Sequence, residues 1–98
     1  MQFGERIREL RESKELLQRQ LAASLEIDTP MFSKIERGER RAKREQVLIL
    51  AELLETNVND LLTDWLADQV HDLVKDEEVA EAALLSVINE LKHPKKHP

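Results

Sequence analysis

The stretch Leu17–Gly38 constrains the fold of this chain most, because it carries the start and stop signals of two short helices separated by a tight turn. Asp28 can accept hydrogen bonds from the first free amides of the helix that follows it. Pro30 falls in the first turn of that helix, where the amide that proline lacks would have been unpaired. Gly38 stands where a left-handed residue ends a helix. The stretch therefore predicts helices over about Leu17–Leu25 and Thr29–Arg37.

Composition and apolar spacing place the rest of the chain in the same structural class. The 98 residues are 41% hydrophobic and 36% charged, with two glycines and three prolines, which favours a helical protein over a disordered or β-rich one. We expect an all-α fold, with a compact five-helix domain and a C-terminal helical extension. The further helices are predicted at residues 2–14, 43–54, from the cap Asn57 to Val74, and 77–91, where the acidic run after Lys75 would start the last helix.

These helices divide the chain into three parts. Residues 1–74 form the compact domain, including a long fifth helix. Residues 75–92 hold a C-terminal helix that packs on this domain or in a dimer interface. Residues 93–98 are expected to be a flexible tail, because two prolines in the last five residues block helix continuation.

Several classes of protein are disfavoured by what the sequence lacks. There is no cysteine, which excludes disulfides, thiolate metal sites and cysteine nucleophiles. The charged N-terminal segment does not resemble a signal peptide, and no stretch approaches the roughly 18 apolar residues of a membrane span. We therefore expect a cytoplasmic protein without a cofactor or a bound metal.

The net charge of −5 is distributed unevenly along the chain. Residues 1–46 hold eleven Lys and Arg against nine Asp and Glu, whereas residues 47–98 hold four against eleven. A local basic patch lies near the end of the predicted 29–37 helix and consists of Lys34, Arg37, Arg40, Arg41, Lys43 and Arg44. Phosphate binding needs only such a local cluster, although a solvated loop of salt bridges is an equally good interpretation of the charges alone.

The motif residues resemble those of the lambda-repressor-like (XRE-type) helix-turn-helix regulators. The matching positions are Leu16, Gln18, Leu21, Ala22, Ile27, Ser33, Ile35, Glu36, Gly38, Leu61 and Leu62. Size, acidic balance and the C-terminal extension make the chain most similar to controller proteins of type II restriction-modification systems. The resemblance implies a homodimer that binds an operator upstream of its own gene and times expression of the linked endonuclease.

Three positions depart from the family pattern. Glu26 and Glu55 replace the glycines usual after the second and fourth helices, which costs about 1 kcal/mol where a left-handed residue is required. Leu17 replaces the usual Ser or Thr cap of the second helix, so that helix start lacks a side-chain acceptor.

The docking geometry of the family assigns roles to the exposed residues. Early outward side chains of the 29–37 helix would reach base edges in the major groove, namely Thr29, Pro30, Ser33 and Lys34. Phosphate contacts, or an arginine in the minor groove, would come from Gln18, Arg37, Arg40, Arg41, Lys43 and Arg44. Without the motif, an ordinary exposed helix face would be the better interpretation.

Surplus apolar residues on the fourth and fifth helices predict a further interface. They are Ile49, Leu53, Trp65, Leu66 and Val70. One short helix contacts too few bases for strong selectivity, which favours a dimer formed by the fifth helix, with or without the last one. The alternative is that the last helix folds over this surface within one chain.

Five aspartates recur every four residues, at Asp60, Asp64, Asp68, Asp72 and Asp76. Successive members are rotated by about 40° on a helix, so all five cannot converge on one metal ion. A solvated acidic ridge that keeps DNA away from this side is the favoured interpretation. His71, without Cys or a paired His, makes a poor metal motif, and we assign no role to His93 and His97.

The leading hypothesis is a sequence-specific, dimeric transcription regulator that binds palindromic double-stranded DNA and has RNA polymerase as a further candidate partner. The second is an antitoxin-like protein-interaction module whose acidic half wraps a basic partner and which also binds its own operator. An enzyme is disfavoured, because the chain has no Cys or Tyr, no glycine-rich phosphate loop and no nucleophile motif.

Overall fold

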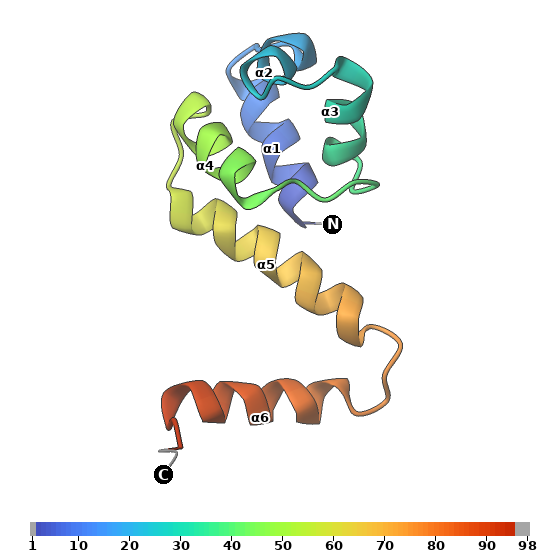
Figure 1. Ribbon diagram of the computed structural model, residues 1–98, viewed down its shortest axis with the longest axis vertical. Helices are drawn as coiled ribbons and strands as arrows, with labels where there is room; N and C mark the ends of the chain where they lie inside the picture. Colours follow the sequence, from blue (N-terminus) through green and yellow to red (C-terminus); the bar gives the residue numbers. More distant parts are fainter. Residues whose placement is uncertain (1, 96–98) are drawn as a thin grey trace.

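The computed structural model describes residues 2–95, and this range contains six helices and no strand (Figure 1). The helices are α1 (Gln2–Ser13), α2 (Gln18–Ser24), α3 (Thr29–Glu36), α4 (Arg44–Leu53), α5 (Val58–Val74) and α6 (Ala80–Lys92). The all-α prediction is confirmed, and each of the first five helices lies within one residue of its expected limits. Residues 96–98 of the expected tail, including His97, lie outside the described residues.

The start of the last helix was predicted wrongly. The acidic residues after Lys75 do not form its first turn, because the chain makes two successive turns there. The Glu77 amide donates to the Val74 carbonyl at 2.9 Å, and the Ala80 amide donates to the Glu77 carbonyl at 3.2 Å. The chain uses these residues to leave α5 and change direction before α6 begins at Ala80.

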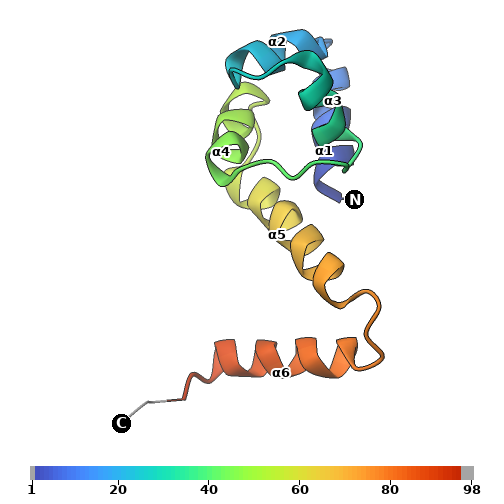
Figure 2. The ribbon, with the colours of Figure 1, turned by 45° about the vertical axis from the view of Figure 1, so that its right-hand side comes forward.

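Helices α1 to α5 gather into one group (Figure 2), and their apolar side chains form one hydrophobic core. The residues with no exposed surface at all come from four of the helices: Ile7, Phe32, Val47, Leu50 and Leu61. The apolar spacing in the sequence predicts that these residues of α1, α3 and α4 are buried, and the structure confirms it. Burial of this kind stabilises the domain by roughly 1.5–3 kcal/mol per large apolar side chain, before conformational entropy is counted.

Four residues that follow the ends of α1 to α4 have the positive φ of the left-handed conformation. Gly38 has φ of 76°, as its position after α3 predicted. Glu26 and Glu55 have φ of 58° and 52°, so they occupy the conformation in which glycine is usual. Glu15, after α1, adopts the same conformation with φ of 56° and was not anticipated. Each of these glutamates costs roughly 1–2 kcal/mol of backbone strain.

The predicted helix starts are formed by the expected groups. The Asp28 carboxylate accepts from the Met31 amide at 2.7 Å, and the Asn57 side-chain oxygen accepts from the Asn59 amide at 2.8 Å. Leu17 contributes no side-chain acceptor, in agreement with the sequence. Instead, Gln20 reaches back and accepts from the Leu17 amide at 2.7 Å, which satisfies the helix start from the other side.

Helix α6 stands apart from the other helices in both views (Figures 1 and 2), and none of its residues is buried. The alternative in which the last helix folds over the domain within one chain is therefore not what the structure contains. Packing of α6 in a dimer interface stays a prediction. No helix in the described part of the chain has the length and apolar character needed to span a membrane.

Candidate nucleic-acid interface

The outward face of α3 is set by the two side chains that anchor the helix in the core. Phe32 and Ile35 are 0% and 2% exposed, and they fix which residues point the other way. The four residues predicted to read bases lie on or beside that outward face: Thr29, Pro30 and Lys34 are exposed, and Ser33 is half-buried. Within residues 2–95, the side chains of Thr29 and Lys34 form no hydrogen bond or ion pair.

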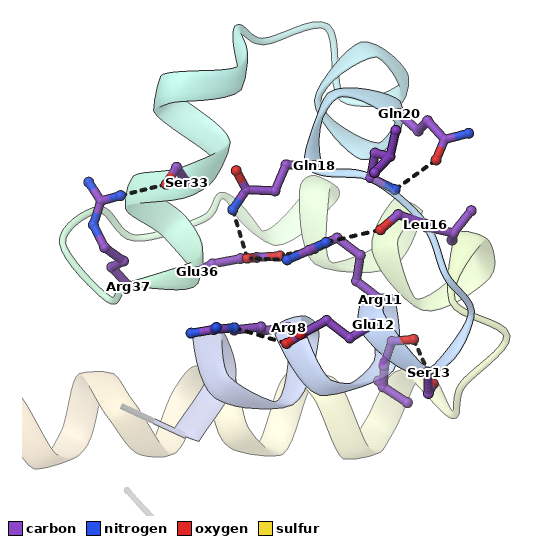
Figure 3. Close-up of polar contacts among 12 residues, drawn as sticks. Arg8, Arg11, Glu12, Ser13, Leu16, Gln18, Gln20, Ser33, Glu36 and Arg37 are labelled. Atoms are coloured by element: carbon purple, nitrogen blue, oxygen red, sulfur yellow. Dashed lines mark hydrogen bonds and ion pairs between the residues drawn. The ribbon is translucent and has the colours of Figure 1, made fainter.

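Arg37 is held at the end of α3 by two polar contacts. Its Nη1 donates to the Ser33 hydroxyl (Figure 3), and its Nε pairs with the Glu39 carboxylate. The hydrogen bond and charge of Arg37 hold the pKa of Glu39 below its ordinary value, and Glu39 in turn raises the pKa of Arg37. A phosphate that binds Arg37 must therefore compete with Glu39.

A buried carboxylate joins α3 to α1 and α2. Glu36 is 7% exposed and accepts from Arg11 twice, at 2.6 Å from Nε and 3.1 Å from Nη2. Arg11 also donates to the Leu16 carbonyl at 2.9 Å (Figure 3). The apolar spacing of residues 2–14 predicts that Arg11 faces away from the core, and this is wrong, because its side chain is only 13% exposed. The available signal was Glu36 itself, because a carboxylate next to the buried Ile35 needs a cationic partner.

Gln18 takes part in the same network. Its Nε2 donates to the Glu36 carboxylate at 2.9 Å, so that the side chain predicted to anchor a phosphate is held by α3. The Gln18 oxygen accepts no hydrogen bond from the described residues and points away from Glu36 in Figure 3. Together with Arg8 and Arg37, these residues line an open groove between α1, α2 and α3.

The basic loop between α3 and α4 is only partly neutralised. Arg41 lies 4.0 Å from the Asp72 carboxylate, and the Arg44 guanidinium lies 5.9 Å above the ring centre of Trp65. Arg40 and Lys43 are exposed and form no ion pair with any residue that the structure describes. The salt-bridge interpretation of the patch thus applies to Arg37 and Arg41 but leaves exposed cations beside α3.

The predicted dimer residues differ in how strongly they are buried by their own chain. The Trp65 Nε1 donates to the Ala42 carbonyl at 2.8 Å, and the ring is half-buried. Leu53 and Val70 are also half-buried, whereas Ile49 and Leu66 are 38% and 54% exposed. Trp65 therefore fixes the α3–α4 loop against α5, and the more exposed residues are better placed to meet a partner.

The interpretation of the five aspartates as a solvated acidic ridge is wrong for two of them. Asp64 and Asp68 are 8% and 9% exposed, because the face of α5 that carries them packs against α1. Asp68 accepts from the amides of Gln2 and Phe3, and Asp64 pairs with Arg6. No group of three metal-ligating side chains is found within residues 2–95.

A short helix that is held by two neighbouring helices and carries the exposed, unpartnered Thr29 and Lys34 beside exposed cations is typical of helical DNA-binding domains. The sequence of residues 2–65 matches the model of the helix-turn-helix domain family, and the chain belongs to this family. The restriction-modification subtype is not addressed by this match.

A solved structure has a similar fold. It is the clp gene regulator ClgR from Corynebacterium glutamicum, with a TM-score of 0.58 and 22% sequence identity. The superposition covers 95% of this chain and 92% of that one. Since α6 holds 13 of the 98 residues, a match over 95% of the chain must include part of this helix. At this identity the likeness concerns the fold alone. The chain has no match among curated proteins.

Proposed function

We propose that the protein is a homodimeric, sequence-specific transcription regulator that binds a palindromic DNA operator through α3, and that it acts by binding rather than by catalysis. The observation that carries the proposal is the outward face of α3, where Thr29, Pro30 and Lys34 are exposed beside the cations of the following loop. An exposed polar face on a short, well-anchored helix suits entry into the major groove.

The base-reading residues have distinct chemistries. Lys34 can donate to guanine O6 and N7, while the Thr29 methyl and the Pro30 ring can pack on a thymine methyl. Ser33 can donate or accept once Arg37 releases its hydroxyl. A good specific contact of this kind is worth roughly 1–3 kcal/mol of discrimination between bases.

The residues around α3 would hold the DNA backbone. Arg40 and Lys43 are the best placed, because their cations are not engaged by carboxylates in the described chain. The other backbone candidates already have partners that phosphate must displace or share: Gln18, Arg37, Arg41 and Arg44. An arginine among 40, 41 and 44 could instead enter a narrow minor groove.

The dimeric state is supported by the apolar surface that the chain leaves uncovered. Leu66 and Leu73 on α5 and Val87 and Leu91 on α6 are each more than half exposed. Large apolar side chains exposed in such numbers are typical of interaction sites in soluble proteins. A twofold dimer would present two α3 helices to two half-sites about one DNA turn apart.

The narrower proposal is an autoregulatory controller of a restriction-modification operon, which could also contact RNA polymerase. Its support is the resemblance of the motif, size and charge to such controllers. Adjacent methyltransferase and endonuclease genes would support it, and their absence would remove this narrower role without affecting DNA binding.

Fluorescence anisotropy with DNA from upstream of the gene, against a scrambled duplex at two salt concentrations, tests the proposal. We expect tight binding to the upstream duplex alone, and loss of the discrimination in Lys34→Ala. Lys75→Ala, which removes an exposed lysine outside the proposed DNA interface, is the matched control. Equal weak binding to both duplexes that disappears as salt rises would mean phosphate attraction only and would reject the proposal.

A second candidate function is favoured by α6. None of its apolar residues is buried, and they lie in the acidic half of the chain, as expected of an antitoxin-like module that wraps a basic partner. Purification from the native host separates the two proposals: a stoichiometric basic protein supports this one, and a homodimer alone counts against it.

A further inference from the structure

Helix α5 carries two buried carboxylates that bind the start of α1. The Asp68 Oδ1 accepts from the Gln2 amide and its Oδ2 from the Phe3 amide, both at 2.9 Å. One turn earlier, Asp64 forms an ion pair with Arg6. The start of α1 is thus held by side chains more than fifty residues further along the chain, and it lies beside α5 in both views (Figures 1 and 2).

The side of α5 that faces the domain changes from apolar to acidic side chains along its length. Its buried members are Leu61, Asp64 and Asp68. Apolar contacts are non-directional and tolerate sliding, whereas hydrogen bonds weaken steeply when their angle changes. The two aspartates therefore fix the direction in which α5 leaves the domain, which apolar packing alone would do less strictly.

Helix α1 is the element that connects this contact to the reading helix. Helix α5 packs against α1 and α4, and α3 packs against α1 and α2. Gly4 of α1 lies so close to α3 that an added Cβ would be 2.3 Å from the Glu36 carbonyl oxygen. Arg11 of α1 also binds the Glu36 carboxylate. A shift of α1 against α5 must consequently move α3.

The opposite side of the same two turns of α5 carries the apolar residues proposed for the dimer. Leu66 and Val70 are each two positions after an aspartate of the pair, which is a rotation of about 200° on a helix. One stretch of α5 thus binds α1 on one side and carries the proposed dimer residues on the other.

The structure assigns Asp64 and Asp68 as positioning residues that set the angle between α3 and α5, the helix proposed for the dimer interface. This angle in turn determines the spacing of half-sites that the dimer can bind. This assignment rests on the proposed function, since it needs two half-sites bound by two copies. Neither residue contacts DNA in this arrangement, so their effect concerns spacing and leaves the choice of bases within a half-site unchanged.

The test uses the full chain and duplexes selected with it from a random pool. The preferred palindrome is rebuilt with one base pair added to or removed from the spacer, and the affinities are compared. Asp68→Asn retains the size of the side chain but replaces one acceptor with a donor. Gln2→Pro deletes one amide from the α1 side and leaves Asp68 intact, because proline is tolerated at a first helical position. Asp60→Asn, an exposed aspartate of α5, matches the charge change.

For the wild type and Asp60→Asn we expect a preference of about tenfold or more for one spacing. In Asp68→Asn and Gln2→Pro we expect this preference to fall at least threefold, with unchanged base choice. A folded Asp68→Asn or Gln2→Pro protein with the wild-type spacing profile would overturn the assignment. If the wild type binds a single half-site as well as the palindrome, the dimeric function itself fails.

Discussion

The domain of α1–α5 and the helix α6 use similar apolar residues with opposite outcomes. In the domain, Ile7, Phe32 and Leu50 are fully enclosed by neighbouring helices. In α6, Leu85, Val87 and Leu91 are 58%, 54% and 75% exposed. A helix of 13 residues is marginal in water without tertiary packing. The apolar side chains of α1–α5 are thus buried against one another, whereas α6 has no buried residue within the described chain.

Leucine truncation in the two regions gives the largest expected contrast. Leu50→Ala removes a fully buried side chain, and we expect it to cost about 2–5 kcal/mol of unfolding free energy at every protein concentration. Leu91→Ala makes the same chemical change in α6 and should cost less than about 0.5 kcal/mol in the dilute monomer. Urea denaturation at two protein concentrations measures both values.

The concentration dependence separates the possibilities for α6. Leu91→Ala should weaken self-association, seen by analytical ultracentrifugation, if α6 lies in the dimer interface. A loss of several kcal/mol in dilute solution would instead mean that α6 packs on its own domain, and the contrast drawn above would be wrong.

Gly4→Ala should be the next largest effect. Alanine normally gains about 1 kcal/mol over glycine inside a helix. At this position the added Cβ would lie 2.3 Å from the Glu36 carbonyl oxygen and 2.9 Å from the Ile35 carbonyl oxygen, and both are backbone atoms. We expect the clash to prevail with a net loss of about 1–3 kcal/mol, measured by thermal unfolding. A stabilised variant would show that α1 is free to move away from α3.

Much of the fold could be predicted from the sequence, because its signals are local. Asp28, Asn57 and Gly38 act within a few residues of their own position, and the apolar spacing of α3 already identified Phe32 and Ile35 as buried. These signals need no knowledge of which helices meet.

The polar contacts between helices could not be predicted in the same way. Asp68 belongs to a series with a regular four-residue spacing, and only the crossing of α5 with α1 separates it from its exposed neighbour Asp72. Arg11 was placed outside for the same reason, since its partner Glu36 is 25 positions away. Residues of the candidate interface were identifiable by motif, but their ion-pair partners depend on tertiary contacts.

A smaller effect is expected at the strained turns. Glu26→Gly relieves a left-handed glutamate with φ of 58°, while it adds conformational freedom to the unfolded chain. The two effects oppose each other, and we expect a net gain of about 0.5–1 kcal/mol in thermal unfolding. Glu52→Gly, in the last turn of α4 where φ is negative, is the control and should lose up to about 1 kcal/mol. Equal losses in both variants would mean that the turn after α2 is not strained.

The smallest effect on stability, with a measurable effect on binding, is expected for Glu39→Gln. The side chain is exposed and its pair with Arg37 contributes little to folding. Removing the carboxylate frees Arg37 for phosphate, so affinity for DNA should rise about 2–5-fold with a steeper salt dependence. The same change at Glu45, which has no ion-pair partner among residues 2–95, should give a smaller increase.

The pH dependence of this gain follows from the lowered pKa of Glu39. A depressed folded-state pKa means that the stabilising pair is present above the ordinary glutamate pKa, about 4.3, and is lost only as pH falls through the lower folded value. Glu39 therefore stays ionised from about pH 5 to about pH 8. The advantage of Glu39→Gln should be constant across this range in anisotropy titrations. An advantage that disappears as pH is lowered towards 5 would show that a different group competes with phosphate for Arg37.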